Sequence, residues 1–178
     1  AAANRMSTLI TDLLTFSRVS RRAPDTQPVN LNDVMNDVMS DLEARIEQTN
    51  ATVTVEPLPT VEADPTHMRQ LMQNLVGNAV KFHRAEVVPK VKVTSSEKDG
   101  GYEIRVTDNG IGFDEKYLDR IFAVFQRLNE RSSYEGTGIG LAVCRKIVER
   151  YDGTITAESK KGRGSTFIIW LPQKKGTH

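Results

Sequence analysis

Three polar side chains recur at helical spacing between Asn74 and Phe82. Asn74 and Asn78 lie four residues apart and Lys81 follows three residues later, so a helix would place all three on one face. Amide oxygens and an ammonium group suit Mg²⁺ and the phosphates that it binds. A solvated polar face is the alternative, and it is the more ordinary interpretation of this segment taken alone.

A carboxylate and two glycines follow a predicted strand, in the run Asp108-Asn109-Gly110-Ile111-Gly112. Gly110 and Gly112 permit a positive φ or a close approach of the backbone to a ligand. The carboxylate of Asp108, at the end of the strand, can accept a hydrogen bond from an exocyclic amine. An ordinary Asx-Gly turn explains this run in isolation equally well.

A glycine-rich run opens a predicted helix. It comprises Gly136, Thr137, Gly138, Ile139, Gly140 and Leu141. Unpaired N–H groups and the helix dipole bind phosphate at such a position. The run is not a dinucleotide-binding fingerprint, because its sixth residue is leucine and a polar loop precedes it. It is not a P-loop, because no Gly-Lys-Ser/Thr follows.

A fourth run extends from Ile121 to Arg127 and contains Phe122 and Phe125. Packing in a hydrophobic core accounts for both phenylalanines as readily as a functional role does. The segment from Gln126 to Glu135 lacks a hydrophobic period, so a loop is predicted there.

Hydrophobic periodicity predicts the elements that position these runs. Helices are predicted over 5–22, 31–49, 65–81, 115–121 and 139–150, and strands near 53–55, from 91 through a turn at 99–101 to 108, over 154–158 and over 165–171. The first helix has an apolar stripe typical of a helical hairpin, although packing on its own domain would also explain it. The predicted fold is a two-layer α/β sandwich: a mixed, mainly antiparallel sheet with helices on one face, preceded by one N-terminal helix.

Composition limits the classes of function. The 178 residues carry a net charge of +1, whereas nucleic-acid-binding domains are usually strongly basic, so no nucleic-acid partner is expected. Cys144 is the single cysteine, which excludes an internal disulfide and fits a reducing compartment. The longest apolar runs, 121–125 and 167–171, fall far short of the roughly 20 residues of a membrane helix, so no direct membrane contact is expected.

The order and spacing of the four runs resemble those of sensor histidine kinases, most of all the phytochrome-type and PAS-linked bacterial kinases. Residues 74–82 resemble the N box of that family, 108–112 its first glycine box, 122–127 its F box and 136–141 its second glycine box. Residues 162–167, followed by Leu171-Pro172, resemble the closing hairpin of the ATP-binding domain. The resemblance implies a Bergerat-type ATP-binding fold and ATP with Mg²⁺ as cofactors.

The resemblance also implies a role for each site residue. Asp108 would bind the adenine amino group, assisted by Thr166 through water, and Asn78 would ligate Mg²⁺ with Asn74 beside it. Lys81 and Arg127 would contact phosphates. The residues that would hold the nucleotide are Asn78, Lys81, Asp108, Gly110, Gly112, Arg127, Gly136, Thr137, Gly138, Ile139, Gly140, Leu141 and Thr166, and those named for catalysis are Asn74, Lys81 and Arg127.

Four segments are expected by the same resemblance. Residues 1–22 would be the second helix of a dimerisation and phosphotransfer hairpin, 23–29 a linker, 30–173 the ATP-binding catalytic domain, and 174–178 a disordered tail. The expected partners are the phosphoacceptor hairpin of the same kinase, a response regulator, and a second copy in a full-length homodimer. The acceptor histidine would lie on the first hairpin helix, outside this chain. A cytoplasmic location is expected, with a parent protein that is either soluble or membrane-anchored.

Two other functions fit the same fold. ATPase clamps related to type II topoisomerases, mismatch-repair ATPases and heat-shock chaperones have a water-activating glutamate in place of Asn74. An amide cannot act as that general base, so Asn74 favours transfer to a protein side chain over hydrolysis. A module that binds nucleotide or a partner without catalysis is the second alternative, and the intact boxes argue against it.

Overall fold

The computed structural model describes residues 10, 13–14, 17, 25–123 and 140–173. Of the helix predicted over residues 5–22, only Ile10, Leu13, Leu14 and Ser17 are described, and all four are helical. The loop predicted over 126–135 and the tail at 174–178 lie outside the described residues. None of the described helices has the length and hydropathy of a membrane span.

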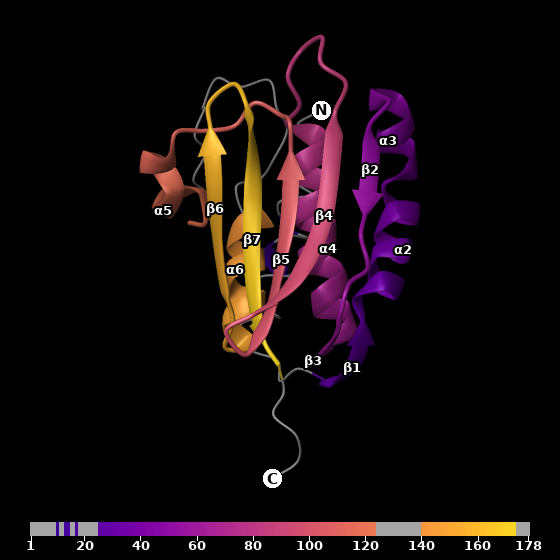
Figure 1. The fold of residues 1–178 in the computed structure, drawn as a ribbon, viewed down its shortest axis with the longest axis vertical. Coiled ribbons are helices and arrows are strands. Elements are labelled where there is room, and N and C mark those ends of the chain that lie inside the picture. Colours follow the sequence, from indigo (N-terminus) through magenta and orange to yellow (C-terminus); the bar gives the residue numbers. More distant parts are fainter. Residues whose placement is uncertain (1–9, 11–12, 15–16, 18–24, 124–139, 174–178) are drawn as a thin grey trace.

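A five-stranded sheet forms one layer of the fold (Figure 1). Its strands, in spatial order, are β2 (Thr52–Val55), β4 (Lys90–Lys98), β5 (Gly101–Asp108), β7 (Gly164–Pro172) and β6 (Thr154–Lys160). The β2–β4 pair is parallel and the other three pairs are antiparallel. The predicted mixed, mainly antiparallel sheet is therefore confirmed.

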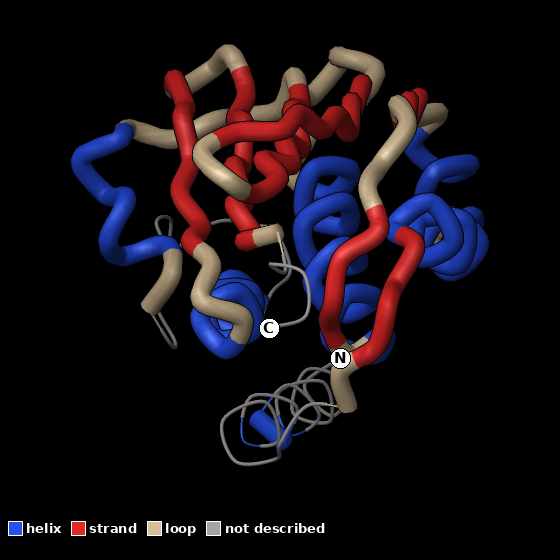
Figure 2. The backbone as a smooth tube through the Cα atoms, turned by 60° about the horizontal axis from the view of Figure 1, so that its bottom comes forward, coloured by secondary structure: helices blue, strands red, loops and turns tan. Residues whose placement is uncertain are grey.

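Helices cover one face of this sheet (Figure 2). They are α4 (Pro65–Lys81) and α6 (Gly140–Arg150), with α2 (Leu31–Asp41) packed on α4 and followed by α3 (Glu43–Thr49). A 3₁₀ turn, η1 (Glu115–Tyr117), and α5 (Leu118–Ile121) lie beside the β6 edge of the sheet (Figure 1). The core lies between the layers, and it includes Val93 of β4, Ile104 and Val106 of β5, and Ile169 of β7, all fully buried. The predicted two-layer α/β sandwich is confirmed.

Helix α4 shows how the sequence sets a boundary and a face. The carboxylate of Asp64 accepts the N–H of Thr66, and Pro65 occupies the first turn, where it removes no intrahelical hydrogen bond. The apolar positions face the core and are all buried: Met68, Leu71, Met72, Leu75, Val76, Ala79 and Val80. The predicted bounds, 65–81, match the structure.

The helix predicted over 31–49 is bent rather than continuous. Leu42 separates α2 from α3, with φ −96° and ψ 3°. The N–H of Leu42 still donates to the carbonyl of Val38, and Ile46 donates to the carbonyl of Leu42. Because hydrogen bonding continues through this position, the break is a local bend, and the helix ends as predicted at Thr49 before a left-handed Asn50.

Two short strands were not predicted. β1 (Gln27–Asn30) and β3 (Thr60–Ala63) form a separate antiparallel ribbon. β1 contains a proline and a single buried residue, Val29, so it gives almost no strand signal. The linker expected over 23–29 therefore overlaps a strand at its end. Just before β1, the N–H of Asp25 donates to the Asp64 carboxylate (3.0 Å), which holds this segment against the start of α4.

Candidate functional site

Asp108 ends β5 on the face that the helices cover. Its Oδ1 accepts the N–H of Gly110 at 2.8 Å and of Ser165 at 3.2 Å. No described residue donates to Oδ2. Since no fully buried side-chain nitrogen or oxygen in the described part of the chain lacks a partner, Oδ2 is accessible. One carboxylate oxygen is therefore saturated by the protein and the other can accept a hydrogen bond from a ligand.

Burial sets the acidity of this carboxyl group. Desolvation raises the pKa of Asp108 to about 6, and the N–H donors of Gly110 and Ser165 oppose the rise without cancelling it. The charged form is the better acceptor for an amine, but keeping this buried carboxyl group ionised lowers the stability of the fold. Such a shift, in a group with an accessible oxygen, is typical of functional sites.

Glycines let three backbone segments meet at Asp108. A Cβ on Gly110 would lie 2.3 Å from the Phe82 carbonyl oxygen at the end of α4, and one on Gly112 (φ +62°) would lie 2.1 Å from the Lys160 carbonyl oxygen. A Cβ on Gly164 (φ +109°) would lie 2.1 Å from the carbonyl oxygen of Asp108 itself. Gly110 and Gly112 were predicted to permit a positive φ or a close approach to a ligand. Gly112 has the positive φ, and both glycines let the backbone approach other parts of the chain.

Backbone hydrogen bonds join the same three segments. The N–H of Ile111 donates to the carbonyl of Phe82 (2.9 Å), and Gly162 donates to the carbonyl of Ile111 (2.6 Å). Asn109 accepts the N–H of Lys90 and donates to the carbonyl of Val88, which fixes the loop after α4. The first glycine box is therefore fastened to α4 on one side and to the β6–β7 turn on the other.

The polar residues predicted on one helix face all lie on the C-terminal half of α4. The Asn74 side chain donates to the carbonyl of Gly140 at 3.3 Å, which brings the start of α6 beside α4. Asn78 is half-buried, and its side chain makes no hydrogen bond to another described residue. Lys81 Nζ lies 5.3 Å from the centroid of the Phe82 ring. The N box and the first residue of α6 are thus brought together.

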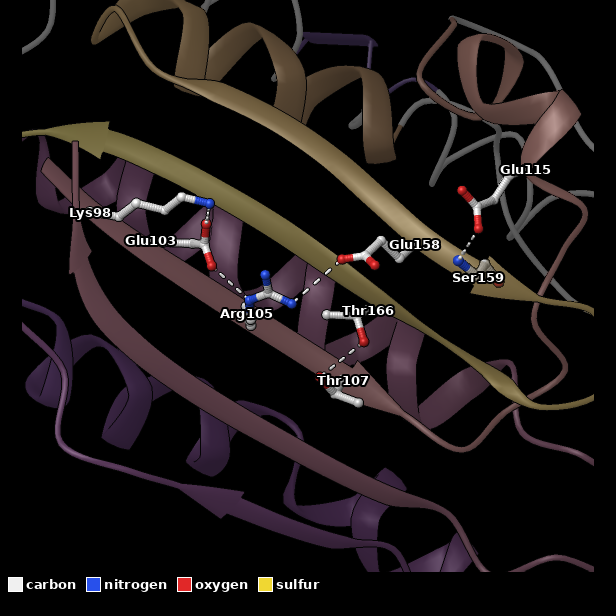
Figure 3. Close-up of polar contacts among 8 residues, drawn as sticks. All are labelled: Lys98, Glu103, Arg105, Thr107, Glu115, Glu158, Ser159 and Thr166. Carbon is white, nitrogen blue, oxygen red and sulfur yellow. Dashed lines mark hydrogen bonds and ion pairs between the residues drawn. The ribbon is translucent and has the colours of Figure 1, made fainter.

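Thr166 lies on the opposite face of the sheet from Asp108. Its hydroxyl contacts Thr107 at 3.1 Å on the open face of the sheet, next to the ion pairs of Arg105 with Glu103 and Glu158 (Figure 3). Asp108 faces the helices. Because side chains alternate along a strand, Ser165 is the residue of β7 that shares the face of Asp108. The alternation of Ser165 with the buried Phe167 could have indicated this from the sequence.

The F box begins as a core element. Phe122 is buried and its ring meets Phe167 edge-on, with centroids 6.1 Å apart, while Phe113 contacts the same ring. The core interpretation is thus confirmed for Phe122. Leu141 packs against the core as well. The remaining predicted site residues, Arg127, Gly136, Thr137, Gly138 and Ile139, lie outside the described residues, as does Phe125.

Comparison with known proteins identifies the family. Residues 63–175 match the model of the histidine kinase-, DNA gyrase B- and HSP90-like ATPases. Cyanobacterial phytochrome A of a Nostoc species is 42% identical over 94% of this chain and 22% of its own length. The chain spans about a fifth of the length of the phytochromes that it matches.

Two solved structures share the fold. Full-length ShkA in complex with AMPPNP has a TM-score of 0.82 and 26% identity, covering 99% of this chain and 38% of ShkA. Histidine kinase ThkA in complex with the response regulator TrrA has a TM-score of 0.76 and 27% identity, covering 97% of this chain and 48% of the matched chain.

The chain therefore belongs to the family of histidine kinase-, DNA gyrase B- and HSP90-like ATPases. Its resemblance to phytochromes and sensor histidine kinases makes it an ATP-binding catalytic domain of the sensor histidine kinase type.

Replacing Gly164 by alanine should destabilise the domain far more than replacing Gly162. Both have positive φ, but a Cβ at Gly164 meets the backbone of Asp108 and Asn109, whereas a Cβ at Gly162 (φ +82°) meets open space. We expect a loss of about 3–5 kcal/mol for Gly164→Ala and about 1–2 kcal/mol for Gly162→Ala. Urea unfolding followed by the fluorescence of Trp170, the single tryptophan, measures both. Equal losses would show that φ alone, rather than the close approach, requires glycine.

Asp108→Asn should stabilise the ligand-free domain at pH 8 but not at pH 4. With a pKa of 3.8 unfolded and about 6 folded, the folded state binds the extra proton between these values. Wild-type stability should therefore fall as the pH rises from about 4 to about 6, by up to about 3 kcal/mol, and the amide removes this loss. Urea unfolding at several pH values checks it, with the exposed Asp119→Asn as control. An identical pH dependence in Asp108→Asn and wild type would contradict the burial of this charge.

Proposed function

We propose that this domain holds ATP and Mg²⁺ between Asp108 and Asn78 and donates the γ-phosphoryl group to a histidine of a kinase hairpin. The observation that carries this proposal is the half-satisfied carboxylate of Asp108. Oδ1 is saturated by two backbone N–H groups, and Oδ2 is an accessible acceptor at the bottom of a rigid loop. An exocyclic amine such as that of adenine matches this acceptor.

The described donor set fits a magnesium nucleotide. Asn78 offers a neutral amide oxygen that no described residue engages, and Mg²⁺ in nucleotide sites takes few protein oxygens besides phosphates and water. Gly110 and Ile111 pack on Phe82, directly after α4, so the carboxylate of Asp108 and the amide of Asn78 belong to one rigid unit. The phosphate contacts of Arg127 and of residues 136–139 stay predictions.

Transfer of a phosphoryl group requires little acid–base chemistry of this domain. When bound, ATP with Mg²⁺ supplies the activated phosphoryl group, and an imidazole nitrogen of the acceptor displaces ADP from it. The domain positions the nucleotide without activating a water molecule for hydrolysis. Asn74 suits this role, because its amide is held by the carbonyl of Gly140 and cannot deprotonate water.

The same proposal includes the partners. A dimerisation and phosphotransfer hairpin of the full-length kinase would supply the acceptor histidine, the full-length protein would be a homodimer, and a response regulator would receive the phosphoryl group. The solved complex of ThkA, a protein of the same fold, with the response regulator TrrA supports the response regulator as a partner. Dependence on ATP and a single, buried cysteine favour a cytoplasmic location.

Incubating the chain with radiolabelled ATP, alone and with a separately produced hairpin from the full-length kinase, tests the proposal. Acid-labile label should appear on the hairpin and not on this chain. Asn78→Ala should lower the rate at least about tenfold, and the double change with Asn74→Ala should abolish transfer. Arg69→Ala is the matched control, because this residue lies on the same helix in an exposed ion pair with Asp41 and should leave transfer unchanged.

Two other results would decide against transfer. Steady hydrolysis of ATP without the hairpin, at a typical enzyme rate, would favour an ATPase clamp. Nucleotide binding without label on any hairpin would favour a module that binds nucleotide without catalysis.

A further inference from the structure

The hydroxyl of Ser159 joins three segments of the site. Ser159 lies near the end of β6, and its Oγ accepts the N–H of Phe113 at 2.8 Å. The same Oγ donates to the carbonyl oxygen of Gly164 at 3.0 Å and contacts Ser165 Oγ at 2.8 Å. The carboxylate of Glu115 accepts the backbone N–H of Ser159 at 3.4 Å, which holds η1 against the same strand end (Figure 3).

The single hydrogen of each serine hydroxyl determines the direction of these hydrogen bonds. A serine hydroxyl has one hydrogen and two acceptor positions. The hydrogen of Ser159 goes to the carbonyl of Gly164, which can only accept, and one acceptor position takes the N–H of Phe113, which can only donate. The contact between the two hydroxyls is then a donation from Ser165 to Ser159. Ser165 has used its only hydrogen, so its Oγ can act toward a ligand or a bound water only as an acceptor.

The Oγ of Ser165 thus adds a second acceptor to the one that Asp108 provides. The backbone N–H of Ser165 already donates to Asp108, and the two side chains share the face of the sheet that the helices cover. The accessible oxygen of Asp108 and the oxygen of Ser165 can thus act toward a ligand only as acceptors. Such a pair suits a primary amine, which carries two N–H donors, and disfavours a carbonyl oxygen in the same place.

We propose that Ser159 is a positioning residue that selects adenine over 6-oxopurines, because it consumes the hydrogen of Ser165 and leaves only acceptors beside Asp108. The inference rests on the proposed nucleotide site at Asp108. Without the Ser159 hydroxyl, the O–H of Ser165 is free to donate, which lowers the penalty for the carbonyl oxygen of hypoxanthine although Asp108 still favours an amine.

Calorimetric binding of ADP and inosine diphosphate to the full chain tests the proposal. Wild type should prefer ADP, and Ser159→Ala should reduce the ADP-to-inosine diphosphate affinity ratio about five- to tenfold, the value of one neutral hydrogen bond. Ser159→Thr keeps the hydroxyl and should restore the ratio. Thr156→Ala, an exposed position on the same strand, should leave it unchanged.

A double-mutant cycle separates polarity from general loosening of the site. If Ser159 acts through Ser165, Ser159→Ala should no longer change the ratio in a Ser165→Ala background. Equal loss of affinity for both nucleotides in Ser159→Ala, or a persistent effect in the Ser165→Ala background, would overturn the inference. Ser159→Cys, which keeps the size but hydrogen-bonds weakly, should lower the ratio in the same direction if the alanine variant does not fold.

The two proposals fail differently. Wild type that binds ADP, with an unchanged ratio in Ser159→Ala, would refute only the role of Ser159. Wild type that binds neither nucleotide would refute the nucleotide site itself.

Discussion

The close packing of three backbone segments around the carboxylate of Asp108 is the constraint on which the site depends. The end of α4, the loop after β5 and the β6–β7 turn approach one another at distances that leave no room for a Cβ at Gly110, Gly112 or Gly164. Hydrogen bonds from Ile111 and Gly162 then fix their relative positions. Asp108 is thus held on a rigid base, although it ends a strand in a region of turns.

The environment of Asp108 favours recognition at the expense of stability. Its burial raises the pKa, and two backbone N–H groups compensate only one oxygen. A ligand amine on the other oxygen would complete the hydrogen bonding and recover part of the cost. Preorganised acceptors of this kind bind without rearrangement, because the folding of the domain has already ordered them.

Elements with strong local signals could be predicted from the sequence. The core face of α4, its Asp64-Pro65 start and the turn at Asp99-Gly100 agree with the structure. The ribbon of β1 and β3 could not be predicted, because its pairing joins segments thirty or more residues apart and β1 has a single buried side chain. This ribbon forms through hydrogen bonds between segments that are distant in the sequence, rather than through local strand propensity.

The contacts of two predicted site residues, Thr166 and Gly112, depend on how the sheet and its turns pack. The role of Thr166 came from a motif and ignored strand alternation, which assigns the face of Asp108 to Ser165. The reason for Gly112 could not be read from the sequence, since the carbonyl that excludes a side chain there belongs to Lys160 in a distant strand. Conversely, the spacing of Asn74, Asn78 and Lys81 was enough to place them together on α4.

The central claim is that the nucleotide lies between the end of α4 and Asp108. A heteronuclear NMR titration of the chain with Mg²⁺ and ADP tests it most directly, because every backbone amide reports separately. The largest shift changes among the described residues should fall in 74–82, 108–113 and 159–165. Amides toward the turn of the β4–β5 hairpin, such as 94–98 and 103–105, should change little. Changes centred on the open face of the sheet, or on the β1–β3 ribbon, would contradict this placement of the nucleotide.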